Sequence, residues 1–187
     1  MTKDKGRLII ISAPSGAGKG TVIRSLLDVK PELVFSVSAT TRAPRIGEVD
    51  GVSYHFVKRE YFYDMIARDE FLEYAEYVGE LYGTPKRLIA ECVDNCVDVL
   101  LDIEIQGARQ VISKMPEAVT IFIVPPDMEE LERRLRGRGT DTEEKLAARL
   151  RRANLELKEK NNYDYIVVND YVPRAVEEII SIIERNV

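Results

Sequence analysis

Short apolar runs recur along the chain, and the four clearest are rich in β-branched side chains. They are Leu8–Ile11, Val97–Ile103, Val119–Val124 and Ile166–Val168. Continuous rather than alternating hydrophobicity is typical of strands that are buried on both faces. We therefore predict that these four runs form strands of one parallel sheet.

Helical patterns follow or separate the predicted strands. Apolar residues at three- to four-residue spacing predict helices over Lys19–Leu27, Met128–Leu135, Glu143–Glu159 and Arg174–Glu184. Strands that alternate with helices favour an α/β fold, in which helices cover both faces of a parallel sheet.

A different pattern occupies residues 37–84. This stretch holds six of the nine tyrosines, and glycines punctuate it at four positions. Val52–Val57 alternates between apolar and polar residues, which indicates a small mixed or antiparallel sheet. We interpret the stretch as an insertion in the parallel core.

The segment Ala13–Gly20 joins the first predicted strand to the first predicted helix. Strand, glycine-rich loop and helix, in this order, form the setting of a phosphate-binding loop. Gly16 and Gly18 allow backbone N–H groups to turn toward phosphate oxygens, and the helix N-terminus adds a positive dipole end. Lys19 would reach the terminal phosphates of a nucleoside triphosphate. The alternative is a glycine-serine turn that merely joins strand to helix.

Two positions depart from the usual pattern of such loops, G-x-x-x-x-G-K-S/T. Ala13 replaces the first glycine, which is a mild change if its φ is negative. Gly20 replaces the serine or threonine whose hydroxyl usually contacts Mg²⁺. Whether Thr21, one residue later, contacts phosphate or metal stays open at this stage.

Composition narrows the class of protein. The 187 residues are enough for one domain, and a net charge of −5 argues against a broadly basic nucleic-acid surface. No apolar run approaches the roughly 20 residues of a transmembrane helix, and no signal peptide is recognisable, so we expect a cytoplasmic protein without membrane contacts. Cys92 and Cys96, spaced i, i+4 in a predicted helix, do not complete a zinc site and are expected to be reduced, partly buried thiols.

A second dense group of polar residues lies between Ser38 and Tyr54. Arg42 and Arg45 are three residues apart, with hydroxyl side chains before them and a tyrosine after them. Guanidinium groups form forked, charge-assisted hydrogen bonds with phosphate, so the segment suits a phosphate clamp. Exposed, solvated arginines in a surface loop are the alternative.

Four motifs together resemble guanylate kinase. They are Ala13-Pro-Ser-Gly-Ala-Gly-Lys19, the arginine–tyrosine segment Thr40-Thr-Arg-x-Pro-Arg-x-Gly-Glu-x-x-Gly-x-x-Tyr-x-Phe56, Leu101-Asp-Ile-Glu-Ile-Gln-Gly107 and Gly137-Arg-Gly-Thr140. Their order and spacing extend over nearly the whole chain. The arginine–tyrosine segment is more specific than the phosphate loop, which many nucleotide enzymes share.

The resemblance implies transfer of the γ-phosphoryl group of ATP to GMP, with dGMP as a further expected acceptor and Mg²⁺ as cofactor. It implies a single domain with a P-loop NTPase core at about 1–36, 85–126 and 158–187. A small mixed-β GMP-binding insertion would span about 37–84, and a helical lid about 127–157. ATP and GMP are the implied partners, and the sequence does not indicate an oligomeric state.

The resemblance also implies roles for single residues. ATP would contact Ala13, Pro14, Ser15, Gly16, Ala17, Gly18, Lys19, Gly20, Thr21 and, on the adenine side, Asn169. The GMP phosphate would be held by Ser38, Arg42, Arg45, Tyr54 and Tyr82, and guanine would be read by Glu73, Thr84 and Glu104. Glu104 departs from the aspartate typical of its position. A solvated helix acid is the alternative for Glu73.

Charged residues near the phosphates complete the expected site. Asp102 lies at the carboxyl end of a predicted strand, and we expect it to organise Mg²⁺ indirectly, through water; capping of a turn is the alternative. In the predicted lid, Arg134, Arg138 and Arg149 would cross the ATP phosphates on closure. Together with Lys19 and Arg42 they would neutralise charge during transfer. Solvated arginines of a charged helix pair are the alternative.

Two rival functions stay open. The first is a guanylate-kinase-like interaction module without catalysis, against which the retention of Lys19, Arg42 and Asp102 argues. The second is a phosphate-loop kinase for another acceptor, against which Arg45, Glu73 and the other predicted GMP residues argue. The only histidine, His55, is expected to be structural.

Overall fold

The computed structural model describes residues 5–137 and 142–185. The described residues divide into two compact units. The first unit is drawn from Met1–Leu8, Glu32–Leu101 and Gln106–Ala118, and the second from Ile9–Pro31, Asp102–Ile105 and Val119–Val187.

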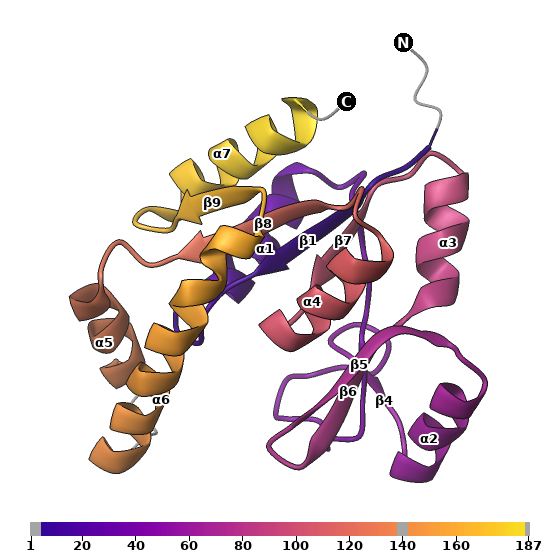
Figure 1. Ribbon diagram of the computed structural model, residues 1–187, viewed down its shortest axis with the longest axis horizontal. Coiled ribbons are helices and arrows are strands. Elements are labelled where there is room, and N and C mark those ends of the chain that lie inside the picture. The colour runs from indigo at the N-terminus through magenta and orange to yellow at the C-terminus, as the bar shows by residue number, and fades with distance from the viewer. Residues whose placement is uncertain (1–4, 138–141, 186–187) are drawn as a thin grey trace. The chain divides into compact units, whose positions relative to one another are not determined.

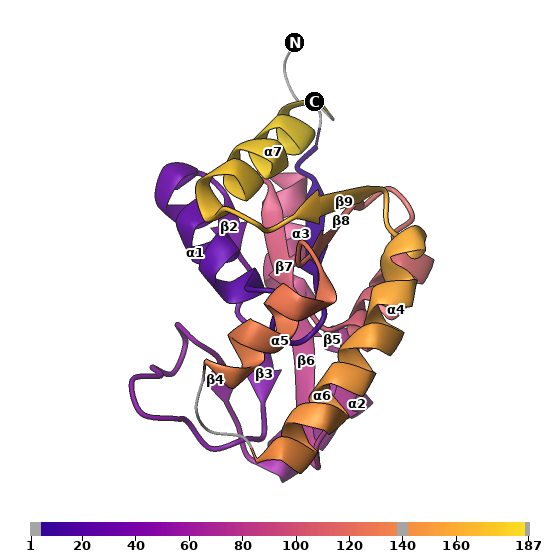
Figure 2. The same ribbon diagram turned by 90° about the vertical axis from the view of Figure 1, so that its left-hand side faces the viewer.

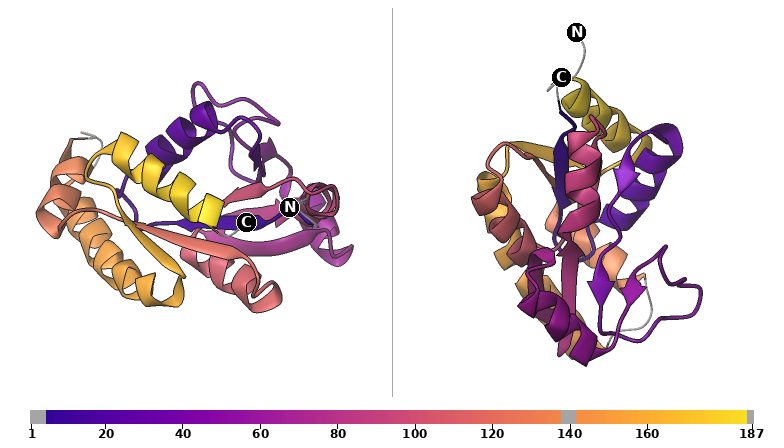
Figure 3. Two further views of the ribbon diagram at one scale, coloured as in Figure 1. Left: turned by 90° about the horizontal axis from the view of Figure 1, so that it is seen from above. Right: turned by 90° about the vertical axis from the view of Figure 1, so that its right-hand side faces the viewer.

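The second unit carries the strands β1 (Leu8–Ser12, from Ile9 on), β8 (Val119–Val124) and β9 (Tyr165–Val168). Its helices are α1 (Lys19–Val29), α5 (Met128–Arg136), α6 (Glu143–Glu156), the 3₁₀ helix η1 (Leu157–Asn162) and α7 (Val172–Arg185). β8 pairs in parallel with β1 on one side and β9 on the other. Helices α1 and α7 lie side by side over one face of these strands (Figure 3).

The first unit contains β2 (Val34–Phe35), β3 (Ala39–Thr40), β4 (His55–Phe56), β5 (Phe71–Tyr77), β6 (Glu80–Pro85) and β7 (Val99–Asp102, up to Leu101). Its helices are α2 (Arg59–Ala67), α3 (Lys86–Asp94) and α4 (Ile105–Lys114, from Gln106 on). The strand orders are β2-β7-β1-β8-β9 in a five-stranded parallel sheet and β4-β3-β6-β5 in a four-stranded mixed sheet. The predicted α/β class is confirmed. Figure 1 labels most of these helices and strands.

The expected burial on both faces holds for two of the predicted strands but not for the last. Every residue of β1 and β8 is buried, which confirms the expectation of burial on both faces. In β9, Ile166 and Val168 are 42% and 37% exposed, whereas Val167 is fully buried. The prediction of two-sided burial is therefore wrong for β9, because it forms the edge of the sheet and alternates instead.

The helices α5 and α6 share an apolar contact of their own. Leu131 and Leu135 of α5 pack with Leu146 and Ala153 of α6, and Leu150 joins them. The apolar residues of α6 therefore pack against α5, and Figure 2 shows the two helices next to each other. Thr142 caps α6, its hydroxyl accepting from the backbone N–H of Lys145 at 3.4 Å.

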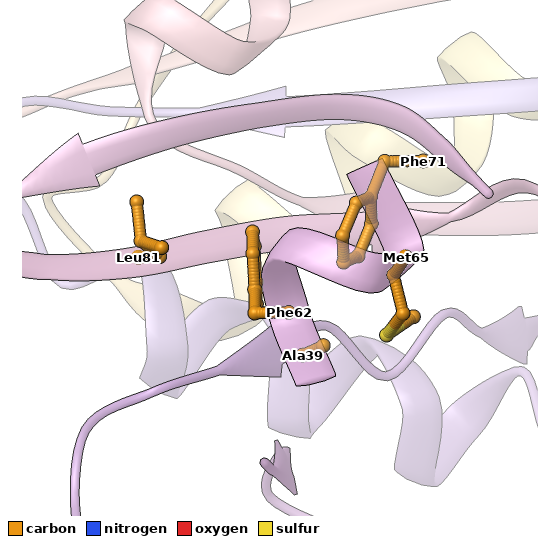
Figure 4. Packing of buried hydrophobic residues seen from close by; sticks show 5 residues of the cluster. All are labelled: Ala39, Phe62, Met65, Phe71 and Leu81. Carbon is orange, nitrogen blue, oxygen red and sulfur yellow. The ribbon is translucent and has the colours of Figure 1, made fainter. Parts of the chain in front are cut away.

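The mixed sheet and α2 enclose a second small core. Phe62 of α2 stacks on Phe71 of β5, with 4.4 Å between ring centroids, and Met65, Leu81 and Ala39 complete the cluster (Figure 4). β3 pairs in parallel with β4, whereas β3–β6 and β5–β6 are antiparallel. The predicted mixed sheet between residues 37 and 84 is therefore confirmed.

The cysteines correct one local prediction. α3 ends at Asp94, and Cys96 has a φ of 61°, so the two cysteines do not share a helix face. Both thiols are free, and Cys96 is exposed. The predicted helix failed here because Asn95 and Cys96 turn the chain out of α3 toward β7.

Candidate active site

The loop between β1 and α1 has the backbone shape that its glycines predict. Gly16 and Gly18 have φ values of 95° and 89°, in the left-handed region that favours glycine. Gly18 also forms the N-cap of α1. Ala13 is buried and is not among the non-glycine residues with positive φ, so its methyl group fits where the usual pattern has glycine.

Space as well as backbone conformation requires these two glycines. A Cβ at Gly18 would lie 2.5 Å from Nδ2 of Asn169, and one at Gly16 would lie 2.8 Å from Cδ2 of Leu135. Gly20 differs, because a Cβ there would meet no heavy atom within 4 Å. A Cβ at position 20 would therefore fit without rearrangement.

Lys19 and Asp102 form an ion pair at this loop. Nζ of Lys19 lies 2.6 Å from Oδ1 of Asp102 and donates to the carbonyl of Ile103 at 3.3 Å. The side chains are 16% and 29% exposed. Oδ1 of Asp102 is buried and lies against the Lys19 ammonium, which balances its charge. Asp102 ends β7, as the sequence predicts.

Asn169 and Arg134 donate hydrogen bonds to the backbone of the loop. Nδ2 of Asn169 donates to the carbonyl of Ala17 at 2.8 Å, and the Asn169 side chain is buried. Arg134 donates to the same carbonyl at 3.1 Å and to the carbonyl of Asn169 at 2.8 Å. Hydrogen bonds from Arg133 and then Arg134 lower the pKa of Glu130 to about 2. The predicted adenine-side residue and one predicted lid arginine therefore both contact the phosphate loop.

Two residues of α6 reach the loop at Ser15. Arg149 donates to the Ser15 hydroxyl at 3.1 Å, and Oε2 of Glu156 accepts from the Ser15 backbone N–H, also at 3.1 Å. Arg152 holds the other oxygen of Glu156 at 2.6 Å. Arg149 was predicted at the phosphates, whereas Glu156 was missed. Arg138 lies outside the described residues.

The predicted phosphate clamp centres on Arg42 in the first unit. Its guanidinium forms a forked pair with Glu48, with N–O distances of 3.0 and 2.9 Å, and faces the Tyr54 ring at 5.5 Å. The hydrogen bond to Glu48 is the main reason that the pKa of Arg42 is raised. Nε of Arg42 is buried and has no hydrogen-bond partner among the described residues. That orphaned donor suits an anionic ligand.

The other predicted phosphate ligands are less enclosed. Tyr54 and Tyr82 meet edge to face, with ring centroids 6.0 Å apart. Arg45 is exposed, and its backbone N–H donates to Glu48 at 2.7 Å. Ser38 is half-buried just before β3. Sequence reasoning missed Glu48, although an acid six residues after Arg42 in an arginine-rich segment was the available signal.

Glu73 is a buried carboxylate rather than a solvated helix acid. It lies on β5 with only 5% of its surface exposed, and the Thr84 hydroxyl donates to its Oε1 at 2.5 Å. Burial raises the pKa of Glu73, while the Thr84 hydrogen bond and then the charge of Lys114 oppose that rise. The structure brings Glu73 and Thr84 together as predicted. Glu104 is exposed and belongs to the second unit.

Comparison with known proteins decides the family. The guanylate kinase family model matches residues 5–186. The chain belongs to the guanylate kinase family. It is 52% identical to the guanylate kinase of Nostoc sp. over 174 residues. These aligned residues cover 93% of this chain and 87% of that protein. It is 47% identical over 182 residues to that of Prochlorococcus marinus subsp. pastoris, with 97% and 99% covered.

A solved structure supports the same assignment. The guanylate kinase from Anaplasma phagocytophilum matches with a TM-score of 0.82 and 37% identity, covering 98% of this chain and 87% of that one. The resemblance to guanylate kinase drawn from the four motifs is thus confirmed. Within the described ranges, no helix is long and apolar enough to cross a membrane.

A guanylate kinase is expected to use Mg²⁺, so the available oxygen ligands matter. Across residues 5–137 and 142–185, no group of three or more His, Cys, Asp or Glu side chains could hold a metal ion. Among the described residues, the oxygen-bearing side chains at the loop include Asp102, which pairs with Lys19, the exposed Thr21, and Ser15 and Glu156. They suit a metal carried mainly by phosphate and water rather than by a protein cage.

Proposed function

We propose that this chain transfers the γ-phosphoryl group of ATP to GMP, giving ADP and GDP. The observation that carries the proposal is the buried carboxylate of Glu73, held by Thr84. Guanine presents adjacent N1–H and N2–H donors, and a carboxylate accepts from both. Adenine has an acceptor at N1, which would leave a buried carboxylate badly paired, so such a site can discriminate strongly.

The acceptor phosphate would be held by Arg42, Arg45, Tyr54 and Tyr82, with Ser38 beside them. Glu48 fixes the Arg42 guanidinium by two hydrogen bonds, and the buried Nε of Arg42 still has a hydrogen to donate. A guanidinium that is oriented before binding loses less entropy when the phosphate arrives. Glu104, which is exposed, would contact guanine through a side chain one methylene longer than the usual aspartate.

ATP would bind at Ala13–Thr21, with its phosphates on the N-terminus of α1. Nζ of Lys19, which now lies at Asp102, would turn toward the terminal phosphates. The buried Oδ1 of Asn169 has no hydrogen-bond partner among the described residues, which suits acceptance from the exocyclic amine of adenine. Asn169 is thereby supported as an adenine contact.

The chemistry requires positioning rather than a general base. The second pKa of a phosphate monoester is about 6, so the acceptor oxygen of GMP is largely ionised at neutral pH. The protein would hold the two phosphates in line and neutralise the charge on the group in transfer. Lys19, Arg42, Arg134, Arg138 and Arg149 would supply the positive charge for this role.

Mg²⁺ would neutralise charge on the ATP phosphates when it is bound. Asp102 would hold the metal indirectly, through water. Thr21, the residue after Gly20, carries the hydroxyl nearest in sequence to the position where phosphate loops usually have serine or threonine. The partly exposed carboxylate of Asp102, at the end of β7, supports this assignment, since a water in the metal's hydration shell can donate to it.

We also propose the functional division expected from the sequence. Residues 37–84 would bind GMP, residues 127–157 would act as a lid, and the remainder would form the core. The apolar contact between α5 and α6 supports movement of the lid as one body. Closure would exclude water, which otherwise competes as acceptor. The protein would have the small molecules ATP and GMP as partners, rather than nucleic acid or membrane. We expect it to act in the cytoplasm.

A coupled ADP-release assay with ATP, Mg²⁺ and a panel of nucleoside monophosphates tests the function. We expect turnover with GMP, weaker turnover with dGMP and none above background with AMP, CMP or UMP. Absence of turnover with every acceptor, alongside measurable nucleotide binding, would favour the interaction module. A preference for another acceptor would favour the second rival kinase.

A further inference from the structure

One face of α4 lies against the strand that carries Glu73. Gly107, Gln110 and Lys114 are spaced i, i+3 and i+7, so they share a face of the helix. All three belong to the first unit, as β5 does. Each meets β5 at Glu73 or at one of its two neighbours in the chain, Leu72 and Tyr74.

Gln110 takes the place of a neighbouring strand. β5 is at the edge of the mixed sheet, where backbone groups lack a partner strand. Nε2 of Gln110 donates to the carbonyl of Tyr74 at 2.8 Å, and its Oε1 accepts from the Tyr74 N–H at 3.4 Å. A single amide side chain therefore satisfies both backbone groups of the residue after Glu73.

Lys114 holds the other side of Glu73. The pairing of β5 with β6 shifts register between Phe71 and Glu73, which makes Leu72 an extra residue in the strand. Nζ of Lys114 donates to the carbonyl of Leu72 at 2.5 Å. Its positive charge also favours the ionised form of Glu73. An irregular point in the strand, directly before Glu73, is thus tied to α4.

Gly107 has no side chain, and the carboxylate of Glu73 occupies the space where a Cβ would lie. A Cβ at this position would lie 2.3 Å from Oε2 of Glu73 and 2.8 Å from its carboxyl carbon. Contacts closer than 3 Å between such atoms force one of them to move. Any larger residue at position 107 would therefore displace the carboxylate or the helix.

We propose that Gln110 and Lys114 are positioning residues for guanine recognition, which hold the bulged edge strand so that Glu73 faces the base, with Gly107 keeping its carboxylate in place. The inference rests on the proposed role of Glu73 in GMP binding. Gln110 and Lys114 bracket Glu73 by one residue on each side, so loss of either hydrogen bond lets the carboxylate shift. A displacement of about 1 Å is enough to weaken a preorganised contact substantially.

The test compares Lys114→Met and Gln110→Leu with matched variants. Lys114→Arg keeps a charged donor for the Leu72 carbonyl, and Lys158→Met makes the same change at an exposed lysine of η1 in the second unit. We expect Lys114→Met, which removes one hydrogen bond to β5, and Gln110→Leu, which removes two, each to raise the KM for GMP by about three- to tenfold. The KM for ATP and kcat at saturating GMP should stay within about twofold, and Lys114→Arg should restore most of the GMP affinity.

A double variant separates positioning from a general loss of structure. In a Glu73→Gln background, Lys114→Met should add little further loss of GMP affinity, because the group that it positions has already been altered. Gly107→Ala should behave like Lys114→Met. Should Gly107→Ala not fold, the other variants still decide the matter.

The outcomes are distinguishable from failure of the proposed function. If wild type does not phosphorylate GMP, or if Glu73→Gln binds GMP normally, the role of Glu73 is wrong. If Glu73→Gln loses GMP affinity while Lys114→Met and Gln110→Leu retain it, the positioning role alone is overturned. The positioning role would also be overturned if Lys114→Met weakened the binding of GMP and of ATP equally, lowered kcat as well, and was not rescued by Lys114→Arg.

Discussion

Oε2 of Glu156 lies 3.1 Å from the backbone nitrogen of Ser15 and accepts its hydrogen bond. A carboxylate thus bonds to the phosphate loop, on a side chain that is only 12% exposed. Backbone N–H groups of such loops serve to bind phosphate oxygens. Glu156 therefore uses a donor of the loop that an anion could otherwise take, and it places negative charge where ATP would add more.

Replacing Glu156 with Gln should strengthen ATP binding. The amide oxygen can still accept from Ser15, but the charge that repels the triphosphate is gone, so we expect the KM for ATP to fall by about two- to fivefold. Steady-state kinetics at two salt concentrations would measure this, and the gain should shrink at high salt. Glu144→Gln, an exposed change on the same helix, should have no effect. A rise in the KM for ATP would instead mean that the carboxylate supports the loop.

Replacing Lys19 with Ala should abolish most turnover without unfolding the protein. One preorganised cation or donor at the transferring group contributes about 10²- to 10³-fold to kcat, so a fall of that size is expected. The Lys19–Asp102 pair is partly exposed, and such pairs contribute little to stability. Circular dichroism should therefore show an unchanged fold. Near-normal kcat would contradict the phosphate-loop mechanism, and Lys158→Ala provides the matched control.

The sequence predicted the parts of the fold that depend on local pattern. β1 and β8 were recognisable because both faces are buried, so hydrophobicity is continuous. β9 was misjudged because edge position is a property of the assembled sheet. The hairpin of β5 and β6 was not predicted, since its turn uses Val78, with a φ of 51°, before Gly79. β-branched residues rarely adopt that conformation, so the usual turn signal was absent.

The candidate site divides in the same way. Gly16, Gly18 and Lys19 follow the spacing that phosphate binding requires, so the sequence alone identifies them as phosphate-loop residues. Glu156 is 141 residues from Ser15 in the chain. No local pattern around either residue predicts that they contact each other. The burial of Glu73 was likewise invisible, because acids are usually exposed and only the packing of β5 against α4 and β6 encloses this one.

Glu73 should give GMP binding a specific pH dependence. Burial raises the pKa of Glu73, so its carboxylate takes up a proton at a higher pH than an ordinary glutamate. The ionised form accepts from guanine, and GMP affinity should therefore rise as pH increases through that raised pKa. Titration calorimetry of GMP binding between pH 4.5 and 8 would measure it. The GMP phosphate titrates near pH 6 as well, so Glu73→Gln supplies the baseline.

The stability of the protein should respond to the same group in the opposite direction. Between the ordinary pKa of glutamate and the raised one, the folded state binds more protons than the unfolded state. The contribution of Glu73 to the free energy of unfolding is therefore larger below this window and is lost as pH rises through it. The difference between wild type and Glu73→Gln in denaturant melts isolates it from acids such as Glu48, whose pKa is lowered. Parallel pH profiles for the two proteins would refute a buried, ionising Glu73.

Replacing Gly20 with Ser should reduce the Mg²⁺ concentration that the protein needs. A Cβ at position 20 meets no heavy atom within 4 Å, so the new side chain fits. Its hydroxyl would stand where phosphate loops usually contact the metal. Serine also suits a helix better than glycine, so thermal stability should not fall. Gly20→Ala is the matched control, because it adds the carbon without the oxygen.

Metal affinity is the decisive readout for Gly20. Binding of Mn²⁺ with ADP, followed by electron paramagnetic resonance, should tighten by about two- to tenfold in Gly20→Ser and stay unchanged in Gly20→Ala, as expected for one added oxygen ligand. The Mg²⁺ dependence of turnover should shift in parallel. Equal metal affinity in all three proteins would mean that the missing hydroxyl is already replaced, and Thr21→Val would then show whether Thr21 replaces it by weakening Mn²⁺ binding in the wild-type background.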